Sequence, residues 1–350
     1  MRYTKVAFLF YPGFRKSVMK VSITSLNRLG LVLFSFICFS AGAASADPLF
    51  KYKGKTYTSS DLPLKYQMKL HDYAMEHRDF QMSTADETLL DIEYGKAAKK
   101  AGKPVLQYVD SLSVIKDPTE AEKKKFYEEN KARIPYPYEK VKADLGNFIL
   151  KRKQAEKRKE VLAKIKKKGG YEFIVPAPQA PKADLKLEKF ASRGQKSSKV
   201  TIVEFADYKC PHCREASLVL DDLYKSYKNK VNFVFVDFPI ISPVSVQVAQ
   251  GAYCAGKQKK YWEFHKMAFD KQGELKAGSS ESFAAQLKLD AKKFKSCLNS
   301  KEAKQYVDQS KSEGDRVGVS GTPTIFVNGV KVAGYQKATV SAALDKALKK

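Results

Sequence analysis

The chain has 350 residues, a length for which two domains are the usual expectation. Apolar residues make up 43%, charged residues 29% and aromatic residues 12%, which argues against wholesale disorder, collagen and coiled-coil arrays. The net charge of +26 favours anionic surfaces such as phospholipid headgroups, cell-wall polymers or acidic proteins, and five cysteines suffice for a redox pair but not for a disulfide scaffold.

Residues 1–46 have the pattern of a secretory signal. Basic residues precede an apolar run at 29–39, which is shorter than the roughly 20 residues of a membrane span. Small residues follow, ending Ala44-Ser45-Ala46, so we expect cleavage after Ala46 and a periplasmic protein that begins at Asp47. The alternative is an uncleaved N-terminal anchor. Cleavage would remove Cys38 and leave four cysteines, an even number that permits two disulfides.

Residues 47–172 are predicted to form a helical domain. After a short strand and a Gly turn near residues 50–62, apolar residues recur at helical spacing over 66–77, and further helices fit 83–101 and 104–114. The next helix is predicted to start with Asp117 as its cap and Pro118 at its first position. A long helix fits 138–168, and Gly169-Gly170 ends it.

The segment 173–184 is rich in proline and is predicted to be an extended linker. Residues 185–350 then alternate strand and helix. Strands are predicted at 199–208 and 230–240, a hairpin at 324–333 around Asn328-Gly329, and helices at 211–227, across most of 244–312, and at 338–350. This order predicts an α/β domain with a helical insertion between its two halves.

The motif Cys210-Pro211-His212-Cys213 follows a predicted buried strand and opens a helix. A thiol at a helix N-terminus lies at the positive end of the helix dipole, which favours the thiolate and lowers the thiol pKa. We therefore expect Cys210 to react with substrates and Cys213 to resolve the mixed disulfide. His212 can support the thiolate by charge or hydrogen bonding, and Pro211 pre-sets a helical backbone angle.

The CxxC motif has two other interpretations. A CxxC can be half of a zinc site, but the remaining cysteines stand 43 residues apart with no second CxxC, so no metal and no cofactor are expected. It can also be a structural disulfide, although so short a loop removes little chain entropy.

Gly321-Thr322-Pro323-Thr324 stands directly before a predicted strand. Proline is tolerated at the first position of a strand, and a cis bond is plausible there. Such a loop could offer the backbone of Thr322 to an extended substrate peptide, with Pro323 shaping the site. By itself the motif is equally typical of an ordinary loop.

Together, EFADYKCPHC, CAGKQKKYWEFH and GTPTIFVNG make residues 185–350 resemble the DsbA-like branch of the thioredoxin superfamily. The resemblance implies a thioredoxin fold with an inserted helical subdomain. It implies a nucleophile at Cys210, a resolving cysteine at Cys213 and a cis-proline at Pro323. Thr322 departs from the valine of the best-known oxidase, which leaves oxidase and isomerase roles both open.

In the same family a buried acidic residue stands six positions before the nucleophile, where this chain has Glu204. A buried carboxyl group has a raised pKa and can exchange a proton with Cys213. The alternative is that Glu204 lies on an edge strand and points to solvent.

The N-terminal half resembles the helical domain of SurA-like periplasmic chaperones, through YKGKTYTSSDL, DPTEAEKKKFYEEN and the long basic helix. The resemblance implies a segment that holds substrates or forms a homodimer. An unrelated helical bundle is the alternative, and no isomerase domain of the parvulin type follows.

Cys254 and Cys297 both lie in the predicted helical insertion. Free buried cysteines are common, but an exported chain with an even cysteine set tends to pair them. We expect a structural disulfide, which would close a loop of 43 residues and contribute roughly 4 kcal/mol on the chain-entropy model.

These features predict a periplasmic thiol–disulfide oxidoreductase that forms or rearranges disulfides in exported proteins. Its expected partners are exported polypeptides with cysteines and a membrane or periplasmic protein that recycles the active site. The alternatives are a disulfide isomerase or reductase, and a peptide-binding chaperone with a thioredoxin-like domain. Basic and aromatic residues are not interleaved, so nucleic acid is not expected.

Overall fold

The structure is a computed structural model that describes residues 48–131, 134 and 136–349. The predicted signal segment 1–46 and its cleavage site lie outside the described residues. Within the described part of the chain, no helix combines the length and the apolar character that crossing a membrane requires.

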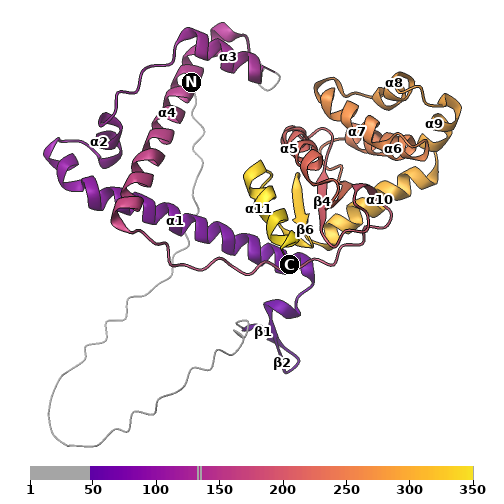
Figure 1. Cartoon of the computed structure of the whole chain (residues 1–350), viewed down its shortest axis with the longest axis horizontal. Helices are drawn as coiled ribbons and strands as arrows, with labels where there is room; N and C mark the ends of the chain where they lie inside the picture. The colour runs from indigo at the N-terminus through magenta and orange to yellow at the C-terminus, as the bar shows by residue number, and fades with distance from the viewer. Residues whose placement is uncertain (1–47, 132–133, 135, 350) are drawn as a thin grey trace, which may run out of the picture. The chain divides into compact units, whose positions relative to one another are not determined.

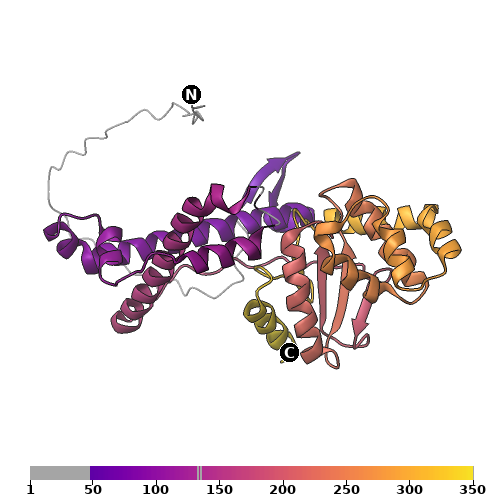
Figure 2. The ribbon, with the colours of Figure 1, turned by 90° about the horizontal axis from the view of Figure 1, so that it is seen from above.

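The first half is helical, as the sequence predicted. A small antiparallel hairpin precedes the helices, and Figures 1 and 2 both show α1 as one unbroken helix. Two separate helices over 66–77 and 83–101 were therefore a wrong prediction, because residues 78–82 contain no glycine or proline to interrupt them. The elements are β1 (Pro48–Tyr52), β2 (Lys55–Thr58), α1 (Leu64–Lys100), α2 (Val105–Ser111), α3 (Glu120–Asn130) and α4 (Tyr138–Gly169).

The start of α3 differs from its prediction by two residues. Thr119, not Asp117, caps the helix: its hydroxyl accepts a hydrogen bond from the Glu122 backbone N–H at 3.2 Å. The Glu122 carboxylate accepts one from the Thr119 N–H at 2.8 Å, so the two residues form a capping box. At the far end of α4, Gly170 adopts φ 64°, the left-handed conformation that ends a helix.

The second half contains a five-stranded sheet in the order β3-β5-β4-β6-β7. β4 and β5 run parallel, and the other neighbouring pairs are antiparallel. The sequence missed β3, which has no β-branched or aromatic residue and pairs with a strand far away in the chain. The strands are β3 (Ala191–Gly194), β4 (Thr201–Ala206), β5 (Asn232–Asp237), β6 (Thr324–Val327) and β7 (Val330–Lys331).

Helices cover both faces of this sheet. One face, with Ile202 and Phe233, packs against α5 and α11, and the other, with Val203 and Phe205, packs against residues of α6 and α10 (Figure 1). Helices α7, α8 and α9 pack with α6 into the insertion between β5 and α10. The helices are α5 (Pro211–Tyr227), α6 (Pro243–Lys257), α7 (Tyr261–Asp270), α8 (Ser279–Gln286), α9 (Ala291–Leu298), α10 (Lys301–Arg316) and α11 (Lys337–Leu348).

The predicted α/β layout with a helical insertion is therefore present. Central strand β4 delivers the chain directly to the start of α5, so the CPHC motif lies where a buried strand end meets a helix N-terminus.

Candidate active site

The two cysteines of the motif lie within one turn at the start of α5. Cys210 is the N-cap residue and Pro211 is the first helical residue, in agreement with its preference for that position. The Cys213 backbone N–H donates to the Cys210 carbonyl at 3.0 Å. Cys210 is 6% exposed and Cys213 is fully buried, so the Cys210 side is the one that solvent reaches.

The surroundings shift the pKa values of the two thiols in opposite directions. Hydrogen bonding from the Cys213 side chain, helped by the Thr322 side chain and by backbone N–H groups of Cys213 and His212, lowers the pKa of Cys210 to about 5. Burial, followed by the hydrogen bond to Cys210 and the charge of Glu204, raises the pKa of Cys213 far above its ordinary value. At neutral pH, Cys210 is therefore a thiolate and Cys213 a thiol.

The loop before β6 faces Cys210. Its Thr322–Pro323 peptide bond is cis. The Cys210 sulfur lies 3.3 Å from the Thr322 carbonyl oxygen, to which it donates when the thiol is protonated. The Thr324 hydroxyl donates to the Gly321 carbonyl at 2.8 Å, which holds the loop closed on itself. Residues more than one hundred positions apart in the sequence thus meet at one sulfur atom.

The His212 side chain contacts Tyr335 and Glu215. Its Nδ1 lies 3.0 Å from the Tyr335 hydroxyl and 3.4 Å from a carboxylate oxygen of Glu215. The contribution of His212 to the Cys210 thiolate is made by its backbone N–H. The sequence predicts that the imidazole ring stabilises the Cys210 thiolate. The hydrogen bonds that the ring makes in the structure are to Tyr335 and Glu215 instead.

Glu204 is in the middle of β4 and is 4% exposed. Because β4 lies between β5 and β6, the alternative of an edge-strand residue facing solvent was wrong. Burial raises the pKa of Glu204 to about 8; the charge of Arg193 opposes this rise, and the charges of Asp221 and Cys210 add to it. The carboxyl group lies within electrostatic reach of both cysteines, because its charge interacts with each of them.

Comparison with known proteins places this site in a family. The thioredoxin family model matches residues 187–349. A probable disulfide bond formation protein D of Bacillus cereus is 32% identical over 174 residues, which are 45% of this chain and 79% of that protein. The chain belongs to the DsbA-like thiol–disulfide oxidoreductases.

Two other similar proteins each match less than half of this chain. An Na(+)/H(+) antiporter NhaA 1 of Salinispora arenicola is 32% identical over 158 residues, so the chain spans about a quarter (24%) of the antiporter's length. The crystal structure of oxidised BdbD from Bacillus subtilis matches with a TM-score of 0.46 and 23% identity, covering 49% of this chain and all of BdbD.

Two further residues position the DsbA-like active site, and sequence patterns did not reveal them. Gln272 donates from its side-chain amide to the carbonyls of Tyr208 and Cys210, each at 2.8 Å. The buried Asp207 carboxylate accepts the backbone N–H of Lys209 at 2.7 Å and two more from residues 240 and 241 at 2.8 Å. The only available sequence signal was an acidic residue, Asp207, near the end of the predicted strand 199–208.

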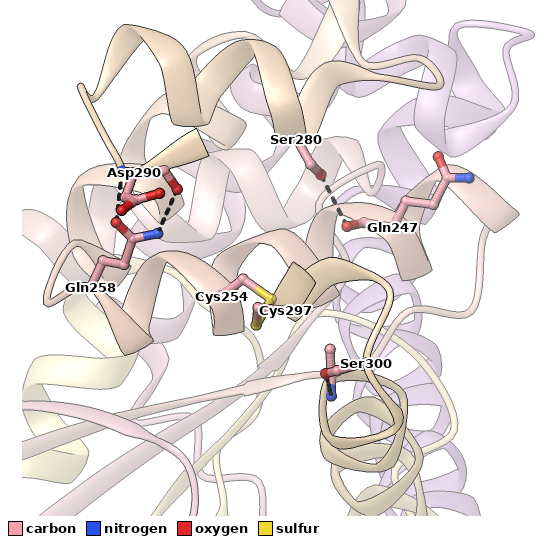
Figure 3. The surroundings of a disulfide bond; sticks show 8 residues. Gln247, Cys254, Gln258, Ser280, Asp290, Cys297 and Ser300 are labelled. Atoms are coloured by element: carbon pink, nitrogen blue, oxygen red, sulfur yellow. Dashed lines mark hydrogen bonds between the residues drawn. A yellow bond between two sulfur atoms is a disulfide. The ribbon is translucent and has the colours of Figure 1, made fainter. Parts of the chain in front are cut away.

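In the insertion of the DsbA-like domain, Cys254 of α6 and Cys297 of α9 form a disulfide, with their Cα atoms 5.7 Å apart (Figure 3). Gln258 and Asp290 add two hydrogen bonds between the same parts of the chain, at 2.8 and 3.3 Å. The Ser280 hydroxyl donates to the Gln247 carbonyl at 3.0 Å and connects α8 to α6. The bridge therefore belongs to a network that fixes α8 and α9 against α6.

Proposed function

We propose that this chain is an exported thiol–disulfide oxidoreductase that forms or rearranges disulfides in exported proteins. The observation that carries the proposal is the opposite pKa shift of two thiols in one helical turn. A low pKa makes the Cys210 sulfur a good leaving group, so a substrate mixed disulfide at Cys210 is readily broken. Cys213, whose pKa is raised, needs a proton carrier to pass between thiol and thiolate.

In the oxidising direction, a substrate thiolate attacks the Cys210 sulfur of the Cys210–Cys213 disulfide. Cys213 leaves as a thiolate and takes a proton from Glu204. A second substrate thiolate then attacks the substrate sulfur of the mixed disulfide, and Cys210 leaves as a thiolate. The substrate has lost two electrons, the two cysteines hold them, and an exported or membrane redox partner accepts them to restore the disulfide.

The loop at Thr322 and Pro323 supports binding of an extended substrate segment. The Thr322 carbonyl already lies 3.3 Å from the Cys210 sulfur, so a substrate strand that pairs with this backbone would bring its own sulfur to the reacting atom. The same contacts serve an isomerase or reductase, in which reduced Cys210 attacks a wrong substrate disulfide. The steady-state redox form of the site selects between the two directions.

The test uses trapping of substrate. Cys213→Ser is expected to accumulate mixed disulfides between Cys210 and a test protein with scrambled disulfides. The Cys210 thiolate attacks a substrate disulfide, one substrate sulfur leaves as a thiolate, and the resolving thiol that would release the substrate is gone. A matched variant, Cys254→Ser with Cys297→Ser, keeps the active site and should accumulate none. Absence of mixed disulfides in Cys213→Ser, with intact folding, would refute the exchange mechanism.

Helix α1 carries a row of exposed, mostly aromatic side chains, called here the stripe: Tyr66, Leu70, Tyr73, His77 and Phe80. These side chains follow each other at alternating spacings of four and three residues, and all are exposed. We propose that the stripe pairs with the α1 stripe of a second copy to form a homodimer.

The charges beside the stripe support pairing with a second copy. In an antiparallel pair of α1 helices centred between Asp72 and Tyr73, the exposed Lys69 of one copy lies opposite the exposed Glu76 of the other, twice. Sedimentation should therefore show a dimer that Tyr73→Glu dissociates and that Lys96→Glu, an exposed change elsewhere on α1, leaves intact. A monomer that binds unfolded polypeptide through the stripe would instead support the chaperone alternative.

Export is proposed from the sequence pattern of residues 1–46. Expression in a bacterium with a periplasm, followed by N-terminal sequencing, should find Asp47 as the first residue. A protein that retains the apolar run would support the membrane-anchored alternative.

A further inference from the structure

Arg193 is held in one position by three side chains from two helices. Its guanidinium carbon lies 4.3 Å from the centre of the Tyr224 ring and 4.2 Å from that of the Trp262 ring, so the group is stacked on two aromatic faces. It also forms an ion pair with Asp221 of α5. A long and flexible side chain is therefore fixed on the inner side of an edge strand.

Arg193 and Glu204 occupy the same face of the sheet. Arg193 pairs with Phe233 of β5, and Phe233 pairs with Ile202 of β4, two residues before Glu204. Because side chains two positions apart along a strand share a face, the Arg193 side chain extends over the same surface as the buried carboxyl group.

Both residues also line one small cavity. Its volume is about 20 Å³, which is room for about one water molecule, and Ser217, Trp262 and His265 complete its polar and aromatic wall. Glu204 Oε1 and Arg193 Nε are buried and, among the described residues, have no hydrogen-bond partner. Buried polar groups are normally hydrogen-bonded. Because the Glu204 acceptor and the Arg193 donor line one cavity the size of a water molecule, the geometry indicates that a water molecule bridges them.

We propose that Arg193 is a positioning residue for proton transfer at Cys213: clamped by Tyr224, Trp262 and Asp221, it faces Glu204 across the cavity and stabilises the carboxylate that remains when Glu204 gives its proton away. The inference rests on the proposed function. When Cys213 leaves the active-site disulfide, Glu204 donates the proton and becomes negative, and Arg193 balances that charge. In the reverse step the carboxylate takes the proton back from Cys213.

The other groups near Glu204 do not supply this positive charge. Asp221 and Cys210 are negative and oppose ionisation of Glu204. His265 of α7 also lines the cavity, but burial and then the charge of Arg193 lower its pKa to about 3, so it is neutral at working pH. The buried Tyr208 hydroxyl stays protonated, since burial raises its pKa. Of the groups named here, Arg193 alone is cationic.

The first test measures Glu204 directly in the full chain. Carbon-13 NMR of labelled glutamate carboxyl groups gives its titration midpoint, assigned by the signal that E204Q removes. R193M should raise the midpoint by about one pH unit, and R193K should raise it less, because a cation near the cavity persists. The matched control R214M, at an exposed position of α5, should leave the midpoint unchanged.

The second test measures the reaction. R193M should slow the release of substrate from mixed disulfides at neutral pH by about three- to tenfold and move the pH profile of release upwards. In the E204Q background, R193M should have no further effect on the profile. If R193M is poorly folded, R193K provides both measurements.

An unchanged Glu204 midpoint in R193M or R193K, or an equal slowing with and without Glu204, would overturn the proposal and leave Arg193 a structural residue. Failure of the proposed function is distinguishable from this. If Cys210→Ser exchanged disulfides as fast as the parent, the exchange mechanism would fail whatever the Glu204 midpoint does.

Discussion

The two cysteine pairs of the DsbA-like domain have the same side chains and opposite surroundings. Cys210 and Cys213 lie in one helical turn, beside a buried carboxyl group and a cis-proline loop, with free thiols. Cys254 and Cys297 join α6 to α9 across 43 residues and lie in a network of hydrogen bonds.

The contrast shows that location decides the chemistry of a cysteine. A helix N-terminus with several N–H donors stabilises a thiolate, which suits exchange. A bridge between distant segments restricts the unfolded chain, which suits stability.

The largest expected effect is on turnover. Cys210→Ser should reduce disulfide formation in a reduced test protein by at least about a thousandfold, because no other sulfur can take its place. The double variant Cys254→Ser with Cys297→Ser should stay within a few-fold of the parent. If both variants lost a comparable share of the disulfide-forming rate, the two cysteine pairs would not differ in function and the account would be contradicted.

Stability should respond in the opposite way. Removing the Cys254–Cys297 bridge by the double serine substitution should lower the free energy of unfolding by about 4 kcal/mol, the loop-entropy value for 43 residues. Urea unfolding with the active site kept reduced would measure it. A loss below about 1 kcal/mol would mean that the hydrogen-bond network alone fixes the insertion.

Glu204 links the active site to pH. Its pKa is raised by burial from 4.5 to about 8, so its contribution to stability is fully present below pH 4.5 and is lost as pH rises through about 8. Glu204→Gln should be more stable than the parent by on the order of 3 kcal/mol at pH 7 and show no such gain near pH 4. Parallel stability curves for the two proteins would contradict a raised pKa.

A smaller effect is expected at Gln272, whose amide holds the carbonyls on either side of Lys209. Gln272→Ala should lower the free energy of unfolding by about 1–3 kcal/mol, since two buried carbonyls lose their partner. Gln286→Ala, at an exposed position of α8, is the matched control and should change stability little. Equal effects would argue against a special role for Gln272.

Local chemistry could be predicted from the sequence, and so could the Cys254–Cys297 disulfide, because an even set of cysteines in an exported chain tends to pair. Most other contacts between distant segments could not be predicted. Strands and helices are recognised from the periodicity of their apolar residues. The CPHC motif is recognised from the spacing of its cysteines and its place at a helix start, so its position in the fold was predictable. Arg193 and Gln272 act on residues that the fold alone brings near them, and β3 has no strand-forming residue. Likewise His212 was assigned to Cys210 from adjacency, but its ring lies against Tyr335 of a remote loop.

The central claim is that the start of α5 makes Cys210 a thiolate while Cys213 stays a thiol. Ultraviolet absorbance of the thiolate, titrated in the reduced protein, tests it directly, with Cys210→Ser as the blank. A midpoint near pH 5 is expected, and the stabilisation of the reduced form, present above the ordinary thiol pKa, should be lost as pH falls through that midpoint. A midpoint near the ordinary value of about 8.5 would contradict the account.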